Sequence, residues 1–222
     1  NTSNYMVSKL LAKNTGQCHS MPLLFLILAE ELETEAFWCF SPSHSFIKFQ
    51  DKQNRWYNIE LTQGAVVTDD FYMNSGFIKS KAIQTGIYLN PRTMKQTIAH
   101  MLNDLSAYYI SRYGYDHFIE ENSNLVLRYS PSDLTAYQHY ANICTVQAQY
   151  VIDACGRPPK EQLPEYPQAH HLFKKMLQSY EKIDSLGYEE MPAEIYHNWL
   201  KQVDKAKTLP ENQPSPIIQI KK

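Results

Sequence analysis

Three residues whose types can together carry out acyl transfer stand in order near the start of the chain: Cys18, His44 and Glu60. A cysteine can act as the nucleophile, a histidine as its base, and a carboxylate as the group that orients the imidazole. The pattern predicts Cys18 at the start of a helix, where free backbone N–H groups and the helix dipole lower the pKa of a thiol. The same N–H groups are suited to stabilise an oxyanion.

The spacing of the two later residues predicts how they meet. If residues 44–50 and 54–60 form a hairpin around a three-residue loop, 51–53, His44 lies directly opposite Glu60. Directly opposite residues have Cβ atoms about 5 Å apart on one face of the sheet. A slip of one residue would move every side chain to the other face. Asn58 lies on the same face as Glu60 and is an alternative partner for His44.

Three further residues are candidates for roles around this triad: Gln17, His19 and Trp56. The side-chain amide of Gln17 is a possible donor to an oxyanion, although a plain turn residue fits the position as well. His19 follows Cys18 directly, so on a helix its side chain points about 100° away from the thiol. We interpret His19 as a substrate-side residue, and Trp56 as a substrate-side or groove-lining residue.

Two other interpretations compete with the triad. Cys18 by itself fits a plain buried cysteine, because free cysteine is among the most buried residue types. A zinc site built from Cys18, His19, Cys39 and His44 is the second, although this spacing fits no common zinc module. We therefore expect no metal and no cofactor.

The elements that must position these residues follow from hydrophobic periodicity and turn signals. A short amphipathic helix is expected over residues 5–13 and a nearly all-apolar helix over 18–33, with Pro22 in its first turn. Short strands are expected over 36–40, 44–50, 55–60 and 65–67. Residues 81–88 are compatible with a strand or an irregular segment. Helices are expected over 93–112, 116–128, 132–154, 169–186 and 193–208, followed by a loosely held end, 210–222.

The ordered motifs of the first part resemble the transglutaminase-like core, which shares the papain-like arrangement of cysteine peptidases. The resemblance rests on Gly16-Gln17-Cys18 before an apolar helix, His44 at the start of a strand, and Trp56-x-x-x-Glu60-Leu-Thr-x-Gly64. It spans roughly residues 6–65. Glu60 stands where the family usually has Asp, which keeps the charge and lengthens the arm by one methylene.

This resemblance implies acyl transfer through a thioester, either amide hydrolysis or transfer of a glutamine acyl group to an amine, with a peptide or protein substrate. Some members of the superfamily have lost catalysis and only bind. The expected fold is α+β, with a transglutaminase-like core of helix and antiparallel sheet over 1–90 and a helical region over 91–222. The papain-like arrangement normally has more helix before the nucleophile, so we expect an N-terminal lobe to be missing or supplied by another chain.

The helical region supports a second hypothesis. Leu125-x-Leu-x-x-x-Pro131, followed by Ala136 and Tyr140, resembles a junction between tetratricopeptide repeats. Plain helical hairpins fit this stretch equally well. A protein or peptide partner on this region, with the core as an inactive scaffold, is therefore the alternative to catalysis.

Composition narrows the remaining classes of function. The formal net charge of the 222 residues is −2, so no global field favours nucleic acid. The longest apolar run, 21–29, is shorter than the roughly 20 residues that span a bilayer. Four cysteines without a Cys-x-x-Cys pair indicate neither a disulfide framework nor a zinc ribbon. The first residue is Asn1, which we interpret as a processed or trimmed start, so the sequence assigns no compartment.

Overall fold

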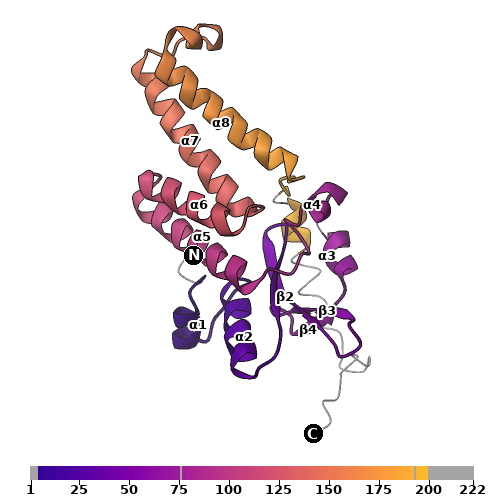
Figure 1. Ribbon diagram of the computed structural model, residues 1–222. Coiled ribbons are helices and arrows are strands. Elements are labelled where there is room, and N and C mark those ends of the chain that lie inside the picture. Colours follow the sequence, from indigo (N-terminus) through magenta and orange to yellow (C-terminus); the bar gives the residue numbers. More distant parts are fainter. Residues whose placement is uncertain (1–4, 76, 193, 200–222) are drawn as a thin grey trace.

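The protein has a mixed α+β fold, seen in a computed structural model that describes residues 5–75, 77–192 and 194–199 (Figure 1). One four-stranded antiparallel sheet has the order β1-β2-β3-β4. Its strands are β1 (Phe37–Ser41), β2 (His44–Gln50), β3 (Trp56–Glu60) and β4 (Ala65–Val67).

Helices precede and follow this sheet. Two come before it, α1 (Val7–Lys13) and α2 (Ser20–Glu31). After it come α3 (Asp69–Ser75), α4 (Ser80–Gln84), α5 (Met94–Tyr113), α6 (His117–Tyr129), α7 (Leu134–Ala154), the 3-10 helix η2 (Lys160–Glu165) and α8 (Pro167–Ser185). Residues 194–199 are also helical. None of the helices in the described part of the chain is both long and apolar enough to cross a membrane.

Most of the expected elements are confirmed, with small shifts at their ends. The helix after Cys18 begins at Ser20 rather than at residue 18, so the cysteine lies in the turn that leads into it. The open segment 81–88 contains the end of α4 followed by irregular chain, and α3 and η2 were not expected. Of the last expected helix, 193–208, residues 194–199 are helical and the others lie outside the described residues, as does the segment 210–222.

The register expected for the β2–β3 hairpin is wrong by two residues. Ile47 pairs with Ile59 and Gln50 with Trp56, so the loop has five residues, 51–55, in place of three. The loop is longer because the Asp51 side chain accepts hydrogen bonds from the backbone N–H groups of Gln53 and Arg55. A shift of two keeps every side chain on its original face, because the side-chain period of a strand is two residues.

The sheet is buried on both faces. On the face toward α2, Trp38 and Ile47 pack with Leu23 and Leu26. On the other face, Cys39, Phe46 and Tyr72 form a second core cluster, completed by Ala82, Ile87, Tyr88, Leu89 and Leu186. Side chains of adjacent strand residues point to opposite faces. Two-sided burial is therefore the reason why both faces of β1 and β2 carry aromatic or apolar residues.

A segment without helix or strand, residues 87–92, connects the sheet to the helical region. The backbone N–H groups of Leu89 and Arg92 donate to the carbonyls of Phe40 (2.9 Å) and Trp38 (3.1 Å). The stretch thereby lies along β1 and leads directly into α5. A side-chain cap by Thr93 on the N–H of Gln96 begins that helix.

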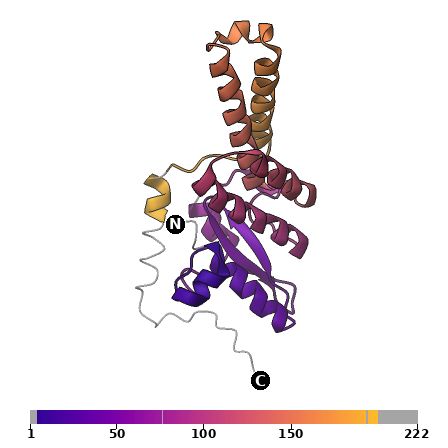
Figure 2. The same cartoon turned by 90° about the vertical axis from the view of Figure 1, so that its left-hand side faces the viewer.

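The helical region packs as consecutive antiparallel helices, and the α7–α8 hairpin projects away from the sheet (Figures 1 and 2). The chain after α8 returns to the sheet. Gly187, with φ +83°, lies so close to α4 that a Cβ atom there would be 2.6 Å from the backbone nitrogen of Ala82. The return therefore requires glycine both for its backbone conformation and for the close approach.

Candidate active site

Cys18 is half-buried in the turn before α2, and the sheet holds its backbone in place. The Ser45 hydroxyl donates to the carbonyl oxygen of Cys18 and accepts from the indole N–H of Trp38 at 2.9 Å. Ser45 and Trp38 are fully buried. This relay fixes the position of the cysteine relative to β2, the strand that begins with His44.

The structure places His44 between Cys18 and Glu60. The Nε2 atom of His44 lies 2.7 Å from the Glu60 Oε2 atom, and a hydrogen bond joins its ring to the Cys18 side chain. Both His44 and Glu60 are buried, with relative exposures of 5% and 0%. Because a carboxylate can only accept, Nε2 carries the proton of the bond to Glu60, which turns Nδ1 toward the thiol.

The surroundings of Cys18 and His44 favour the charged forms of both side chains. Burial alone would raise the pKa of the Cys18 thiol, but the hydrogen bond and charge of His44, the charge of His19 and the N–H of Ser45 lower it below its ordinary value. Burial acts to lower the pKa of His44, yet its hydrogen bonds to Cys18 and Glu60 raise that pKa to about 9. A thiolate beside an imidazolium is thus stabilised at neutral pH.

Glu60 is held by several donors besides His44. The Tyr72 hydroxyl donates to Oε2 at 3.0 Å, and the backbone N–H of Thr62 donates to Oε1 at 3.0 Å. The Thr62 hydroxyl also donates to Oε1. Although burial opposes ionisation, the hydrogen bonds from His44 and Thr62 and the charge of His44 keep the pKa of Glu60 below its ordinary value. The carboxylate is therefore fixed in orientation and charged.

Asn58, the alternative partner for His44, is engaged elsewhere. Its side-chain amide donates to the Asp69 carboxylate at 2.8 Å, and Lys48 binds the same carboxylate at 2.9 Å. The geometry thus assigns the contact with the imidazole to Glu60.

Of the two candidates Gln17 and Trp56, the structure brings only Gln17 close to Cys18. Gln17 lies beside Cys18 in the turn before α2, and its Nε2 atom is buried without a hydrogen-bond partner among the described residues. Trp56 lies at the opposite end of β3 from Glu60, opposite Gln50, and is 45% exposed. Gln17 therefore remains a candidate oxyanion donor, whereas Trp56 is not brought to the cysteine.

His19 faces a cavity beside the triad and binds a residue that is 85 positions away in the sequence. Its Nδ1 atom lies 2.9 Å from the Asp104 Oδ1 atom. Burial tends to lower the pKa of His19, but the hydrogen bond and charge of Asp104 raise it overall. The positive charge of His19 in turn stabilises the Cys18 thiolate.

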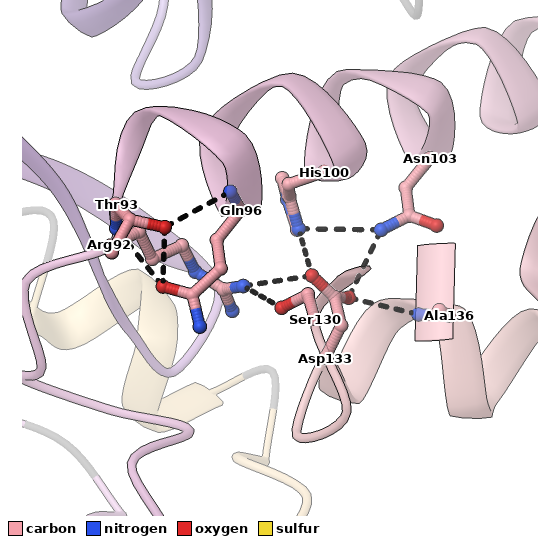
Figure 3. A network of polar contacts seen from close by, with 8 residues as sticks. All are labelled: Arg92, Thr93, Gln96, His100, Asn103, Ser130, Asp133 and Ala136. Carbon is pink, nitrogen blue, oxygen red and sulfur yellow. Dashed lines mark hydrogen bonds and ion pairs between the residues drawn. The ribbon is translucent and has the colours of Figure 1, made fainter. Parts of the chain in front are cut away.

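A buried polar network anchors α5 and α7 next to this cavity (Figure 3). Asp133, fully buried, accepts hydrogen bonds from Arg92 (2.9 Å), His100 (2.7 Å) and Asn103 (3.0 Å), and caps the first turn of α7. Burial opposes its ionisation, but the charges of His100 and Arg92 hold the pKa of Asp133 far below the ordinary carboxyl range. Arg92 also donates to Ser130 at 3.0 Å.

The helical segment 194–199 covers the imidazole of the triad. The Trp199 ring packs edge-on against the His44 ring, with centroids 5.0 Å apart, and is 5% exposed. Its indole N–H is buried without a partner among the described residues. Trp199 therefore limits access to the site from this side.

Sequence reasoning missed Ser45, Tyr72, Asp104 and Trp199. Only Ser45 carried a local signal, because it follows His44 directly at the start of the strand. The others come from distant segments, and no short motif predicts where these segments pack.

The zinc interpretation receives no support from the geometry. Cys39 points into the core cluster with Phe46 and Tyr72, and burial raises the pKa of its thiol to about 12. Among the described residues, no group of three or more His, Cys, Asp or Glu side chains is arranged to hold a metal ion.

Comparison of the chain with known protein families, with curated proteins and with solved structures finds no match.

Proposed function

We propose that the protein is a cysteine-dependent acyl-transfer enzyme of the amidase or peptidase type, related in arrangement to the transglutaminase-like core. The observation that carries this proposal is the buried chain of contacts from Cys18 through His44 to Glu60. A purely structural cysteine gains nothing from a hydrogen-bonded imidazole whose far side is bound to a fixed carboxylate. Nucleophile, base and orienting group in contact are the arrangement that covalent catalysis needs.

The reaction follows from the positions of these groups. The Cys18 thiolate attacks the carbonyl carbon of an amide, and the π electrons of the carbonyl move to its oxygen. The His44 imidazolium gives its proton to the leaving nitrogen, the C–N bond breaks and a thioester remains. Water or an amine then attacks the thioester and loses a proton to His44, and the bond to sulfur breaks to regenerate the thiolate.

Two groups near Cys18 are suited to stabilise the oxyanion of the tetrahedral intermediates. The turn before α2 brings the positive end of the helix close to the thiol. The unpaired side-chain N–H2 group of Gln17 lies in the same turn. Preorganised donors of this kind cost no reorganisation during the reaction.

The test is the pH dependence of Cys18 alkylation by iodoacetamide between about pH 4 and 9, followed by peptide mapping. Cys39 and Cys144 serve as internal controls, because burial raises the pKa of both thiols. We expect Cys18 to react well below the pH at which an ordinary thiol does, and His44→Ala to abolish this advantage. A Cys18 that titrates like an ordinary thiol in both proteins refutes the proposal.

A substrate screen with amide and peptide libraries then identifies the acyl group. Cys18→Ala is expected to abolish turnover of any substrate so found, and full activity of that variant contradicts the assignment of the nucleophile.

The alternative is an inactive scaffold with a binding surface on its helices. The observation in its favour is the α7–α8 hairpin, which projects away from the sheet (Figure 1). The exposed side chains of this hairpin include Val146, Tyr150, Leu177 and Tyr180. An unactivated Cys18, together with a partner whose binding is lost when Tyr150 is changed to Ser, favours the scaffold over the enzyme.

A further inference from the structure

A cavity of about 420 Å³ lies next to the candidate triad, between the sheet and the helical region. His19 and His44 form part of its wall on the side of the nucleophile. The opposite wall comes from α5 and α7. A cavity of this size is within the range that binds small molecules or part of a peptide.

The α5–α7 wall carries polar atoms that have no hydrogen-bond partner among the described residues. They are His100 Nε2, Asn103 Oδ1, Asp104 Oδ2 and His139 Nε2. The residues His100, Asn103 and Asp104 are each more than nine-tenths buried. Each unpaired polar group in such a place costs free energy unless something pairs with it. Four on one wall indicate that a ligand completes the set.

The contacts of Asn103 and His100 with Asp133 determine whether their unpaired atoms donate or accept hydrogen bonds. The Asp133 carboxylate can only accept, so Asn103 must turn its amide nitrogen toward it and leave Oδ1 free (Figure 3). For the same reason His100 carries a proton on Nδ1, which lies 2.7 Å from Asp133. Nε2 of His100 accepts only when the ring is neutral, so it is not counted among the acceptors.

The unpaired atoms of Asp104 and His139 are acceptors, as Oδ1 of Asn103 is. Asp104 uses Oδ1 for His19, and its Oδ2 is unpaired. The His139 ring is hydrogen-bonded to the backbone carbonyl of Asn103, so the nitrogen that donates is Nδ1 and the unpaired Nε2 has a lone pair. Burial keeps the pKa of His139 below its ordinary value, which favours this neutral ring.

A wall with three buried unpaired acceptors, on Asn103, Asp104 and His139, matches a group that donates several hydrogen bonds. A primary ammonium group has three N–H donors and no acceptor, whereas a carboxamide or a hydroxyl also has an oxygen that needs a donor. One of the three acceptors belongs to a carboxylate, Asp104, and the cavity is also lined by Tyr88, an aromatic ring of the kind whose face attracts cations.

We infer that this cavity binds a primary ammonium group. Resting on the proposed function, the inference names the substrate class: amides or peptides whose acyl part carries a free amine, which the cavity holds while Cys18 attacks the carbonyl. The amine is either the α-amino group at the start of a peptide or the amine of a side chain.

Binding to the Cys18→Ala protein tests the cavity without any need for catalysis. Isothermal titration would compare two ligands that carry an amine, alaninamide and Nα-acetyl-lysinamide, with two that carry none, Nα-acetyl-norleucinamide and Nα-acetyl-glutaminamide. We expect at least one amine ligand to bind ~10-fold or more tightly than both neutral ligands, because hydrogen bonds to charged groups are the stronger ones. Equal or tighter binding of a neutral ligand, or no binding of any of the four, overturns the inference.

Two variants locate the binding. Asp104→Asn is expected to remove the preference for the amine, and His139→Gln to weaken it. The matched control is Asp153→Asn, which changes an exposed carboxylate on α7 that pairs with Arg157. If Asp104→Asn does not fold, as judged by circular dichroism, the amine preference of His139→Gln alone tests this location. An amine preference that both variants retain contradicts this location.

The two proposals fail in different ways. Ordinary reactivity of Cys18 toward iodoacetamide with a retained amine preference refutes the enzyme and leaves an ammonium-binding cavity. An activated Cys18 without amine preference leaves the enzyme and refutes the substrate class.

Discussion

His44 and Glu60 form a 2.7 Å hydrogen bond across two paired strands, although they are not opposite each other in the register. In the observed pairing, in which Ile47 faces Ile59, Glu60 falls level with Phe46, two residues along β2 from His44. The contact is therefore diagonal. Diagonal neighbours on one face have Cα atoms about 7–8 Å apart, a distance that long side chains can bridge. The extra methylene of Glu relative to Asp gives this carboxylate the reach that the diagonal needs.

The charge of Glu60 sets the pH range of the site. In Glu60→Gln the hydrogen bond to His44 can persist, but the negative charge is lost, so the pKa of His44 falls from about 9. In the proposed reaction an imidazolium protonates the leaving group, so we expect the alkaline fall of the proposed acyl-transfer activity to move to lower pH. The pH–rate profile measures this, and Glu30→Gln on the exposed surface of α2 is the control. An unchanged alkaline limb contradicts the assigned role.

The charge of His19 supports the thiolate from the other side. In His19→Gln this positive charge is absent, so we expect the pKa of Cys18 to rise. The midpoint of its alkylation by iodoacetamide then shifts toward alkaline pH. His117→Gln is the matched control, because that imidazole is exposed and pairs only with glutamates of its own helix among the described residues. Equal midpoints in the wild type and His19→Gln would show that the two residues are not coupled.

The carboxylate of Asp133 stabilises the junction of α5 and α7. Asp133→Asn leaves the guanidinium of Arg92 buried without its counter-charge, and we expect a loss of roughly 3–5 kcal/mol in the free energy of unfolding. Urea denaturation at pH 7 measures this loss. Asp153→Asn, in an exposed pair with Arg157, should change the midpoint little.

The same substitution has a pH signature. The pKa of Asp133 is lowered in the folded protein, so its stabilisation is present above the unfolded carboxyl pKa of about 4 and is lost as the pH falls. The difference in stability between wild type and Asp133→Asn should therefore be complete at pH 7 and shrink in acid. A difference that is independent of pH contradicts this account.

The indole of Trp199 restricts access to His44. Trp199→Ala removes the ring that packs against the imidazole, so a bulky maleimide should alkylate Cys18 several-fold faster relative to iodoacetamide. The ratio of the alkylation rates with the two reagents cancels any change in the intrinsic reactivity of the thiol. Trp56→Ala is the control, since that ring lies at the far end of β3. A ratio that does not change shows that the reagents reach the thiol from another side.

Much of the local structure and part of the site follow from the sequence by itself. The apolar run after Cys18 and the aromatic strands are long and regular enough to predict α2, β2 and β3. Side chains alternate between the two faces of a strand, so a register shift of two residues leaves His44 and Glu60 on the same face. For this reason an expected register that was wrong still led to a contact that the structure contains.

Only the tertiary structure decided which residues complete the site. The five-residue loop that sets the register depends on side-chain hydrogen bonds from Asp51 to the loop backbone. The partner of His19 comes from α5, 85 residues further along the chain, and Trp199 reaches His44 from beyond α8. Contacts between distant segments depend on how whole helices pack against the sheet. Local periodicity and spacing contain no information about that packing, so the sequence determined the order and faces of the catalytic candidates, and the fold determined their surroundings.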